Sequence, residues 1–330
     1  MMIRSRPTLT AALLGALLVA FVPALAIAQT SEEVPLLTPV PLDASDPNVR
    51  AVGPLRFVAG YQLALDKPNW GGFSDLCVWA DPDGGTRLVM VGDMGTDAVI
   101  GFTGMPEALG DVAVIKLFAL RTPDGRRITD KAMGDAEAMV CDSPTRRVIG
   151  FERQHRLWVY DGDTVAALPI PPSARMLGSN EGIEGLARLS DGRLLMVAEG
   201  AQDAKRGPAW VQTADGSGWE ELTLLRSEGF QPTGVATLPD GDVLLLERFY
   251  SPERGAAARI SLIRKAQIQA DAEIRPTELA RIAPPLTVDN FEGIAVAPAT
   301  DGGTLVFLLS DDNFNPAQRT LLLVFPWIIG

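Results

Sequence analysis

The stretch NEGIEGLARLSDGRLLMVAEG, residues 180–200, has the pattern of a β-hairpin. An apolar run begins beside Glu184, a turn containing Asp191 and Gly192 follows, and a second apolar run ends at Glu199. Two such runs joined by Asp and Gly are typical of antiparallel strands with a tight turn between them. The acids at both ends of the hairpin are the feature that a functional interpretation has to explain.

The same pattern occurs five times along the chain. The copies begin at Ser74, Glu137, Glu184, Thr233 and Glu292, with spacings of 63, 47, 49 and 59 residues. Units of about 50 residues built from short strands are typical of propeller blades. We therefore predict an all-β fold, a β-propeller with five blades. Six blades, with one degenerate unit, and an open sandwich with coincidental hairpins are the alternatives.

The outer strands of the blades are also visible in the sequence. PAWVQT and WEELTLL follow the third hairpin, and ARISLIRK and TELARIA follow the fourth. After the fifth hairpin only RTLLLVF remains, so that blade is one strand short. Residues 54–65, PLRFVAGYQLAL, have no partner of their own, and we expect them to complete the last blade and close the ring. Residues 247–255, ERFYSPERG, are interpreted as a connecting loop, either an ordinary one or one that covers the axial opening.

The N-terminus has the features of a signal peptide. Arg4 and Arg6 precede an apolar stretch that ends in the small residues Ala26 and Ala28. We predict a signal peptide over 1–28, a flexible leader over 29–50 and the propeller domain over 51–330; a permanent membrane anchor is the alternative for the first segment. No later run of about 20 apolar residues occurs, so we expect a periplasmic or secreted protein without a membrane span after cleavage.

The two cysteines, Cys77 and Cys141, lie one position apart in the aligned repeats. This offset places them on opposite faces of equivalent strands. We therefore favour two small buried side chains over a disulfide, although an exported protein would allow the bond.

The acids that bound the hairpins form two columns in the aligned repeats. The strand-start column is Ser74, Glu137, Glu184, Thr233 and Glu292. The strand-end column is Asp93, Glu152, Glu199, Glu247, and then Asp311 or Asp312. The start of the first strand of an antiparallel hairpin lies beside the end of the second, and the first strand of each blade lines the channel. The sequence therefore predicts an acidic opening at one end of the propeller axis.

Several arrangements would stabilise so many neighbouring carboxylates. Oxygen ligands suit Ca²⁺, and the predicted ligands are Glu137, Glu184, Glu199, Glu292, Asp311 and Asp312. Arg153, Arg248 and Arg319 are near enough in sequence to pair with some of the acids. Some carboxyls could stay protonated and act as acids, with Glu184 and Glu199 as the catalytic candidates. A purely structural alternative is that the acids accept backbone N–H bonds and lock neighbouring blades.

Composition excludes several classes of function. The formal charge of −12 argues against a nucleic-acid binder. His155 is the single histidine, which rules out multi-histidine zinc sites, and no G-x-S-x-G elbow is present for a serine hydrolase. The five lysines all lie outside the two acidic columns.

Three segments resemble the family called "esterase-like activity of phytase". They are NEGIEGLARL…GRLLMVAEG, PTGVATLPDGDVLLLERFY and FEGIAV…LLSDDNFNPAQRTLLLVF, and the last is the most specific. The similarity extends over about residues 52–326. It implies an exported, phytase-like β-propeller with activity on phosphate esters.

The sequence therefore leads to one favoured function and two alternatives. The favoured one is a metal-assisted phosphoric-ester hydrolase, a monomer that uses Ca²⁺ and acts on a small-molecule substrate. One alternative is a non-catalytic propeller that binds a small ligand, a peptide or an envelope partner. The other is a calcium-dependent hydrolase of the gluconolactonase type, in which Asn180, Asn290 and Asn313 would assist the acids.

Overall fold

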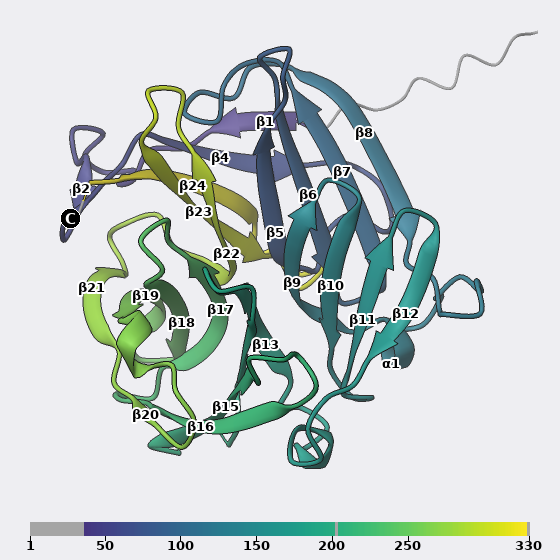
Figure 1. Ribbon diagram of the computed structural model, residues 1–330. Coiled ribbons are helices and arrows are strands. Elements are labelled where there is room, and N and C mark those ends of the chain that lie inside the picture. The colour runs from purple at the N-terminus through teal and green to yellow at the C-terminus, as the bar shows by residue number, and fades with distance from the viewer. Residues whose placement is uncertain (1–35, 202–203, 329–330) are drawn as a thin grey trace, which may run out of the picture. The chain divides into compact units, whose positions relative to one another are not determined.

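The computed structural model describes residues 36–201 and 204–328, so the predicted signal peptide lies outside the described residues. Five sheets of four or five strands surround a common axis, and their first strands contact one another in a ring (Figure 1). The prediction of an all-β, five-bladed propeller is confirmed.

The blades follow one another along the chain. Blade 1 contains β5 (Phe73–Ala80), β6 (Thr86–Gly92), β7 (Thr96–Phe102) and β8 (Val112–Ala119). Blade 2, which follows the short helix α1 (Lys131–Gly134), contains β9 (Ala136–Ser143), β10 (Arg146–Phe151), β11 (Arg156–Asp161) and β12 (Thr164–Leu168). Blade 3 contains β13 (Ile183–Arg188), β14 (Leu194–Ala198), β15 (Arg206–Gln212), β16 (Trp219–Leu225) and β20 (Glu273–Ile274).

The remaining elements complete the ring. Blade 4 contains β17 (Gln231–Thr237), β18 (Val243–Ser251), β19 (Gly255–Ile263) and β21 (Thr277–Ile282). Blade 5 contains β22 (Asn290–Pro298), β23 (Thr304–Asp311), β24 (Thr320–Trp327), β4 (Ala59–Ala64) and β1 (Leu36–Pro39). Outside the blades are the hairpin of β2 (Ala51–Val52) and β3 (Leu55–Arg56) and the 3-10 turns η1 (Ala174–Met176) and η2 (Lys265–Gln267).

Apolar side chains fill the spaces between neighbouring blades. Five buried clusters are present in the described chain, and each joins one pair of adjacent sheets. Both faces of a blade are therefore covered. This explains why the second strands, such as β14 with the sequence LLMVA, are apolar at every position and do not alternate.

The ring is closed within blade 5, as the sequence predicts. β4 pairs with β24 in antiparallel register, Leu63 opposite Thr320, and β1 adds a fifth strand beyond β4. β1 lies inside the segment 29–50 that we interpreted as a flexible leader, so the predicted boundary at residue 51 is too late. Residues 36–39 are ordered because their backbone groups complete the ladder of β4.

Each inner strand carries one extra residue at its start, which is a β-bulge. In blade 3, Ile183 lies opposite Ala198 and Gly185 lies opposite Val197, so Glu184 has no cross-strand partner. The same shift leaves the other strand-start residues unpaired, namely Ser74, Glu137, Thr233 and Glu292. A bulge re-aims the side chain of its extra residue. The strand-start residues therefore do not lie directly opposite the strand-end acids but between the ladder and the axis.

Residues 247–255 form a hairpin rather than the predicted loop. β18 continues to Ser251 and β19 begins at Gly255, and the two strands stay paired to the tip. The neighbouring strand β17 pairs with β18 only as far as Arg248. The hairpin therefore extends beyond the inner strand of its blade.

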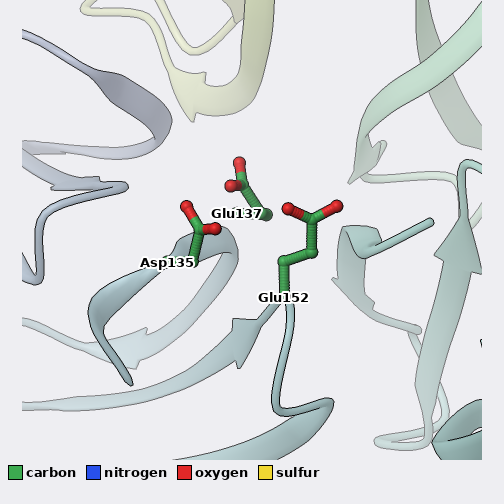
Figure 2. A group of neighbouring side chains, drawn as sticks. All are labelled: Asp135, Glu137 and Glu152. Carbon is green, nitrogen blue, oxygen red and sulfur yellow. The ribbon is translucent and has the colours of Figure 1, made fainter. Parts of the chain in front are cut away.

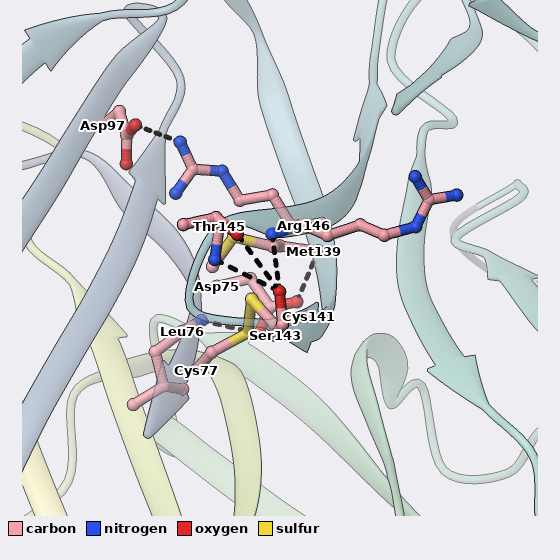
Figure 3. Close-up of a disulfide and its surroundings, with 10 residues drawn as sticks. Asp75, Leu76, Cys77, Asp97, Met139, Cys141, Ser143, Thr145 and Arg146 are labelled. Carbon is pink, nitrogen blue, oxygen red and sulfur yellow. Dashed lines mark hydrogen bonds and ion pairs between the residues drawn. A yellow bond between two sulfur atoms is a disulfide. The ribbon is translucent and has the colours of Figure 1, made fainter. Parts of the chain in front are cut away.

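The two cysteines form a disulfide, so the expectation of two separate thiols is wrong. Cys77 of β5 and Cys141 of β9 join blades 1 and 2 (Figure 3). Neighbouring blades stack face to face, so the face of one blade meets the opposite face of the next. Equivalent strands therefore need cysteines on opposite faces to form the bond, and the offset of one position provides this arrangement.

Asp75, beside this disulfide, locks three blades together. Its carboxylate, in β5, accepts hydrogen bonds from Met139 N of β9 at 2.7 Å and from Leu76 N at 2.8 Å (Figure 3). A further backbone bond reaches it from Ile294 of β22. The blade-locking role that we considered for the strand-start glutamates therefore belongs to the residue that follows Ser74.

Replacement of both cysteines by serine is expected to lower the free energy of unfolding by about 2–4 kcal/mol, because the bond restricts the unfolded chain. Denaturant titration of the oxidised protein and of the double variant measures this difference. A reductant should destabilise the original protein and leave the double variant unchanged. Equal stability of the two oxidised proteins would contradict the prediction.

Candidate functional site at the propeller axis

A cavity of about 130 Å³ lies where the inner strands begin, and all five blades contribute to it. We call it the axial cavity. Its lining consists of Ser74, Asp93, Lys131, Glu137, Glu152, Glu184, Glu199, Arg248, Glu292, Asp311 and Asn313. Seven carboxylates therefore face two cationic side chains.

Five of the six predicted metal ligands line this cavity. They are Glu137, Glu184, Glu199, Glu292 and Asp311, and they include both catalytic candidates. Asp312 is not among the lining residues. Its carboxylate accepts hydrogen bonds from Gly72 N at 3.0 Å and from Thr320 Oγ1 at 3.1 Å, so it fastens the segment before blade 1 to blade 5.

A glycine allows the acids of blades 2 and 3 to meet closely. A Cβ atom on Gly182 would lie 2.6 Å from Glu184 Oε1 and 2.9 Å from Glu152 Cγ. The backbone N–H of Gly182 also donates to the carboxylate of Glu152. A side chain at position 182 would therefore displace both acids.

Blade 2 gathers three carboxylates on one side of the axial cavity. One ligand atom from each of Asp135, Glu137 and Glu152 lies within 4.8 Å of the other two (Figure 2). The Glu152 backbone N–H donates to Asp135 O at 2.8 Å, which holds the end of β10 against the start of β9. Asp135 is fully buried and forms ion pairs with Arg153 and with Lys131, the latter at 3.3 Å.

The side of the cavity next to blade 1 contains a cation from α1 and a hydroxyl group from β5. Lys131, at the start of α1, forms an ion pair with Asp93. Ser74 is 98% buried, and its Oγ has no hydrogen-bond partner among the described residues. This hydroxyl is therefore free to bind a water, an ion or a ligand in the axial cavity.

Blade 4 breaks the acidic series. Thr233 donates to Phe291 O at 3.2 Å, and Glu247 is buried against Arg259, with an ion-pair distance of 2.6 Å. The next residue, Arg248, reaches the axial cavity in place of an acid. Its guanidinium lies 3.8 Å from Glu199 and 3.6 Å from Glu292.

Burial and mutual repulsion raise the pKa values of the carboxyls in the cavity. Burial, followed by Glu184 and Glu292, raises the pKa of Glu137 well above its usual range, and burial and Glu199 do the same for Glu184. Burial raises the pKa of Glu152 to about 7, with Asp135 adding to the shift. Burial and Glu292 raise the pKa of Asp311 to about 8.

The cations relieve this repulsion in part. Burial raises the pKa of Glu292, but Arg248 and the amide of Asn290, which donates at 2.7 Å, oppose the rise. Burial lowers the pKa of Lys131, but its ion pairs with Asp93 and Asp135 outweigh this effect and leave it raised. Both cations therefore stay charged, and the cavity keeps an excess of carboxyl groups.

Sequence reasoning overlooked Lys131 and Asp135 and considered Arg248 only as one possible partner of the acids. Asp135 lies two residues before Glu137, and side chains at this spacing share one face of an extended segment. The sequence therefore does indicate that Asp135 lies beside Glu137. Arg153 pairs with Asp135 and Arg319 with Asp289, so neither is among the residues that line the cavity.

The three predicted asparagines have different positions. Asn313 lines the axial cavity, and Asn290 is held against Glu292. Asn180 lines a separate depression beside the cavity. The arrangement as a whole offers several carboxylates, one hydroxyl and one amide to a cation, and two fixed positive charges to an anion.

The chain matches the model of a family described as "Phytase-like: Esterase-like activity of phytase" over residues 68–314. Comparison with curated proteins gives no match. No helix in the described part of the chain is long and apolar enough to span a membrane.

Solved structures resemble the chain at low identity. A thermostable family-43 glycoside hydrolase is 11% identical with a TM-score of 0.49, and the match covers 79% of this chain and 91% of that one. An α-L-arabinofuranosidase from Lactobacillus brevis is 12% identical with a TM-score of 0.49, covering 80% and 93%. A protein of unknown function from Dyadobacter fermentans is 16% identical with a TM-score of 0.44, covering 89% and 94%. At these scores the resemblances support no conclusion about activity.

The stability of chelator-treated protein is expected to fall as the pH rises from about 5 to about 8. Asp311 and Glu152 keep their protons to about pH 8 and 7 in the folded state, whereas carboxyls of an unfolded chain ionise near pH 4. Unfolding therefore releases protons in this interval, and a rising pH favours it.

Thermal unfolding followed by circular dichroism at several pH values tests this expectation. The double variant with Glu152→Gln and Asp311→Asn should show a flatter dependence on pH, because the two titrating groups are gone. A melting temperature that is constant or rises between pH 5 and 8 would contradict the assignment.

Proposed function

The chain belongs to the phytase-like family, whose description is "Esterase-like activity of phytase". We therefore propose that it is a metal-assisted hydrolase of phosphate esters. The observation that carries the proposal is the convergence of seven carboxylates, Lys131 and Arg248 in one axial cavity. Acids in this number bind a divalent cation, and a cation next to fixed positive charges binds a phosphate group.

The residues present fit a hard cation such as Ca²⁺. Carboxylate, amide and hydroxyl oxygens are its usual ligands, and the cavity provides all three types. The buried hydroxyl of Ser74, which lacks a protein partner, is an independent sign that the cavity is built for a ligand. A volume of about 130 Å³ leaves room for an ion together with water.

In the proposed site the strand-start glutamates Glu137, Glu184 and Glu292 hold the cation. Bound there, the cation would polarise the phosphoryl oxygens and lower the pKa of a bound water. The chain's own groups have other tasks. Arg248 and Lys131 orient the anionic ester, and Glu152, whose pKa lies near 7, exchanges a proton with the attacking water or the leaving group.

The proposal includes export from the cytoplasm. It is supported by the sequence of residues 1–28 and by the disulfide between Cys77 and Cys141, a bond that persists in oxidising compartments. The substrate would then be a small molecule met outside the cytoplasm.

A second candidate is a calcium-dependent hydrolase of carboxylic esters or lactones. It is favoured by the position of Asn313 in the cavity, since an amide oxygen next to carboxylates suits a single Ca²⁺. The same cavity would serve both reactions, and the substrate distinguishes them.

Purified protein is expected to release phosphate from phytate or from p-nitrophenyl phosphate with Ca²⁺ and to lose this activity with a chelator. Glu184→Gln should reduce kcat/KM by about 100-fold or more, because it removes a ligand from the centre of the site. Glu253→Gln, at the exposed tip of the β18–β19 hairpin, is the matched control and should retain activity. Metal analysis of the protein provides the ion content.

The outcomes separate the candidates. Activity that resists both the chelator and Glu184→Gln would reject the metal-assisted mechanism. Hydrolysis of p-nitrophenyl acetate or a lactone without phosphate release would favour the second candidate. Absence of all hydrolysis, with a melting temperature raised by Ca²⁺, would favour a non-catalytic binding protein.

A further inference from the structure

The hairpin of β18 and β19 divides the surface beside the axial cavity into two depressions. The amide-lined depression, of about 770 Å³, contains Asn290, Asn313, Asn315 and Gln318. The acid-lined depression, of about 630 Å³, contains Glu181 and Glu199. Arg248, Phe249 and Tyr250 line both, so one short stretch of β18 forms the wall between them.

Tyr250 is the most exposed residue of this wall. It is 70% exposed, and it lies two residues beyond Arg248 on the same strand. Residues two apart in a strand point to the same side. The side chains of Tyr250 and Arg248 therefore point to the same side of β18, and Tyr250 lies farther from the propeller axis than Arg248 does.

The wall is braced from its other side by a column of rings and cations. Phe249 packs on Phe230 with a centroid distance of 5.6 Å, and the guanidinium of Arg254 lies 4.5 Å from the Phe249 ring. Arg259 lies 4.3 Å from the ring of Phe230. Tyr250 is thus presented on a supported hairpin rather than on a free loop.

We propose that Tyr250 is a platform on which a ring in the alcohol part of the substrate stacks, with the phosphate held at Arg248 and the axial cavity. The inference rests on the proposed function and adds Tyr250 as a residue that determines specificity, favouring esters of a ring alcohol over esters of an acyclic one. Aromatic faces bind the apolar face of such a ring, and neighbouring amides bind its hydroxyl groups.

Charge places the ring in the amide-lined depression. Glu199 also lines the axial cavity, but the acid-lined side adds the carboxylate of Glu181, which repels an anionic ester. The amide-lined side has a single carboxylate, Asp289, which Arg319 neutralises in an ion pair at 3.4 Å. The volume of this depression also falls within the range of ordinary small-molecule sites.

The test compares a ring ester with an acyclic one, glucose 6-phosphate and glycerol 3-phosphate, in the presence of Ca²⁺. Tyr250→Ala should raise KM for glucose 6-phosphate about tenfold and leave KM for glycerol 3-phosphate and both kcat values nearly unchanged. Tyr250→Phe keeps the ring and should behave like the original protein. Phe118→Ala, which removes an exposed aromatic ring from β8 in blade 1, is the matched control.

A second pair of variants tests which of the two depressions holds the ring of the substrate. Gln318→Ala should raise KM for glucose 6-phosphate, and Asn180→Ala, in the acid-lined depression, should not. Equal effects of Tyr250→Ala on both esters, or an equal effect of Phe118→Ala, would overturn the platform. A reversed pattern for Gln318 and Asn180 would overturn its placement.

Failure of the proposed function is distinguishable from failure of the platform. If the protein releases phosphate from neither of these esters, nor from phytate or p-nitrophenyl phosphate, the proposed function falls, and calorimetry with glucose 6-phosphate and Ca²⁺ becomes the test of the platform. A Kd that is about tenfold weaker in Tyr250→Ala then supports the platform. No binding, or a Kd that Tyr250→Ala leaves unchanged, overturns it.

Discussion

The extra residue at the start of each inner strand is the constraint on which the site depends. Without it, a side chain at this level would belong to the regular alternation of the strand and would face a neighbouring blade. The bulge takes the residue out of the ladder, and it does so at the same level in all five blades. In blades 2 to 5 the next residue is alanine or glycine, which permits the close approach of backbones: a Cβ atom on Gly234 would lie 2.8 Å from Glu292 O.

Two blades depart from the repeat and make the distribution of charge in the cavity asymmetric. Blade 4 turns its acid outward to Arg259 and presents Arg248, and blade 1 presents a hydroxyl and is served by Lys131 from outside the repeat. In the order of the ring, the two positive charges therefore separate the acids of blades 2 and 3 from those of blades 5 and 1. A symmetric ring of five acids would bind a cation, but it would repel any anion that has to approach the cation.

The sequence predicts the fold well because each hairpin shows its turn, its apolar runs and its bounding acids locally. It also predicts most of the acidic lining, since the strand-start column depends only on the repeat. It does not predict Lys131, because nothing local shows that the segment before β9 folds back over the axis. Glu247 was expected at the opening but is buried, because it lies opposite Pro232 and so corresponds to Ala198 of blade 3, which lies opposite Ile183. Arg248 occupies the position that corresponds to Glu199. The sequence does not show the disulfide, because the bond depends on how the opposite faces of neighbouring blades meet in the ring.

The closure of the ring within blade 5 sets the order in which the molecule can be completed. β4 is synthesised long before its partner β24. The carbonyl of Pro41 similarly waits for its hydrogen-bond donor Thr287, 246 residues later in the chain. Blades 1 and 2 and the first four strands of blade 3 are built from contiguous segments, so these sheets can form as the chain emerges. Blade 4 is interrupted by β20, which pairs with β16 of blade 3. Blade 5, which supplies Glu292 and Asp311 to the axial cavity, is completed last. A nascent chain therefore carries an unpaired edge for most of its synthesis, and assembly of the acidic centre coincides with the step that covers it.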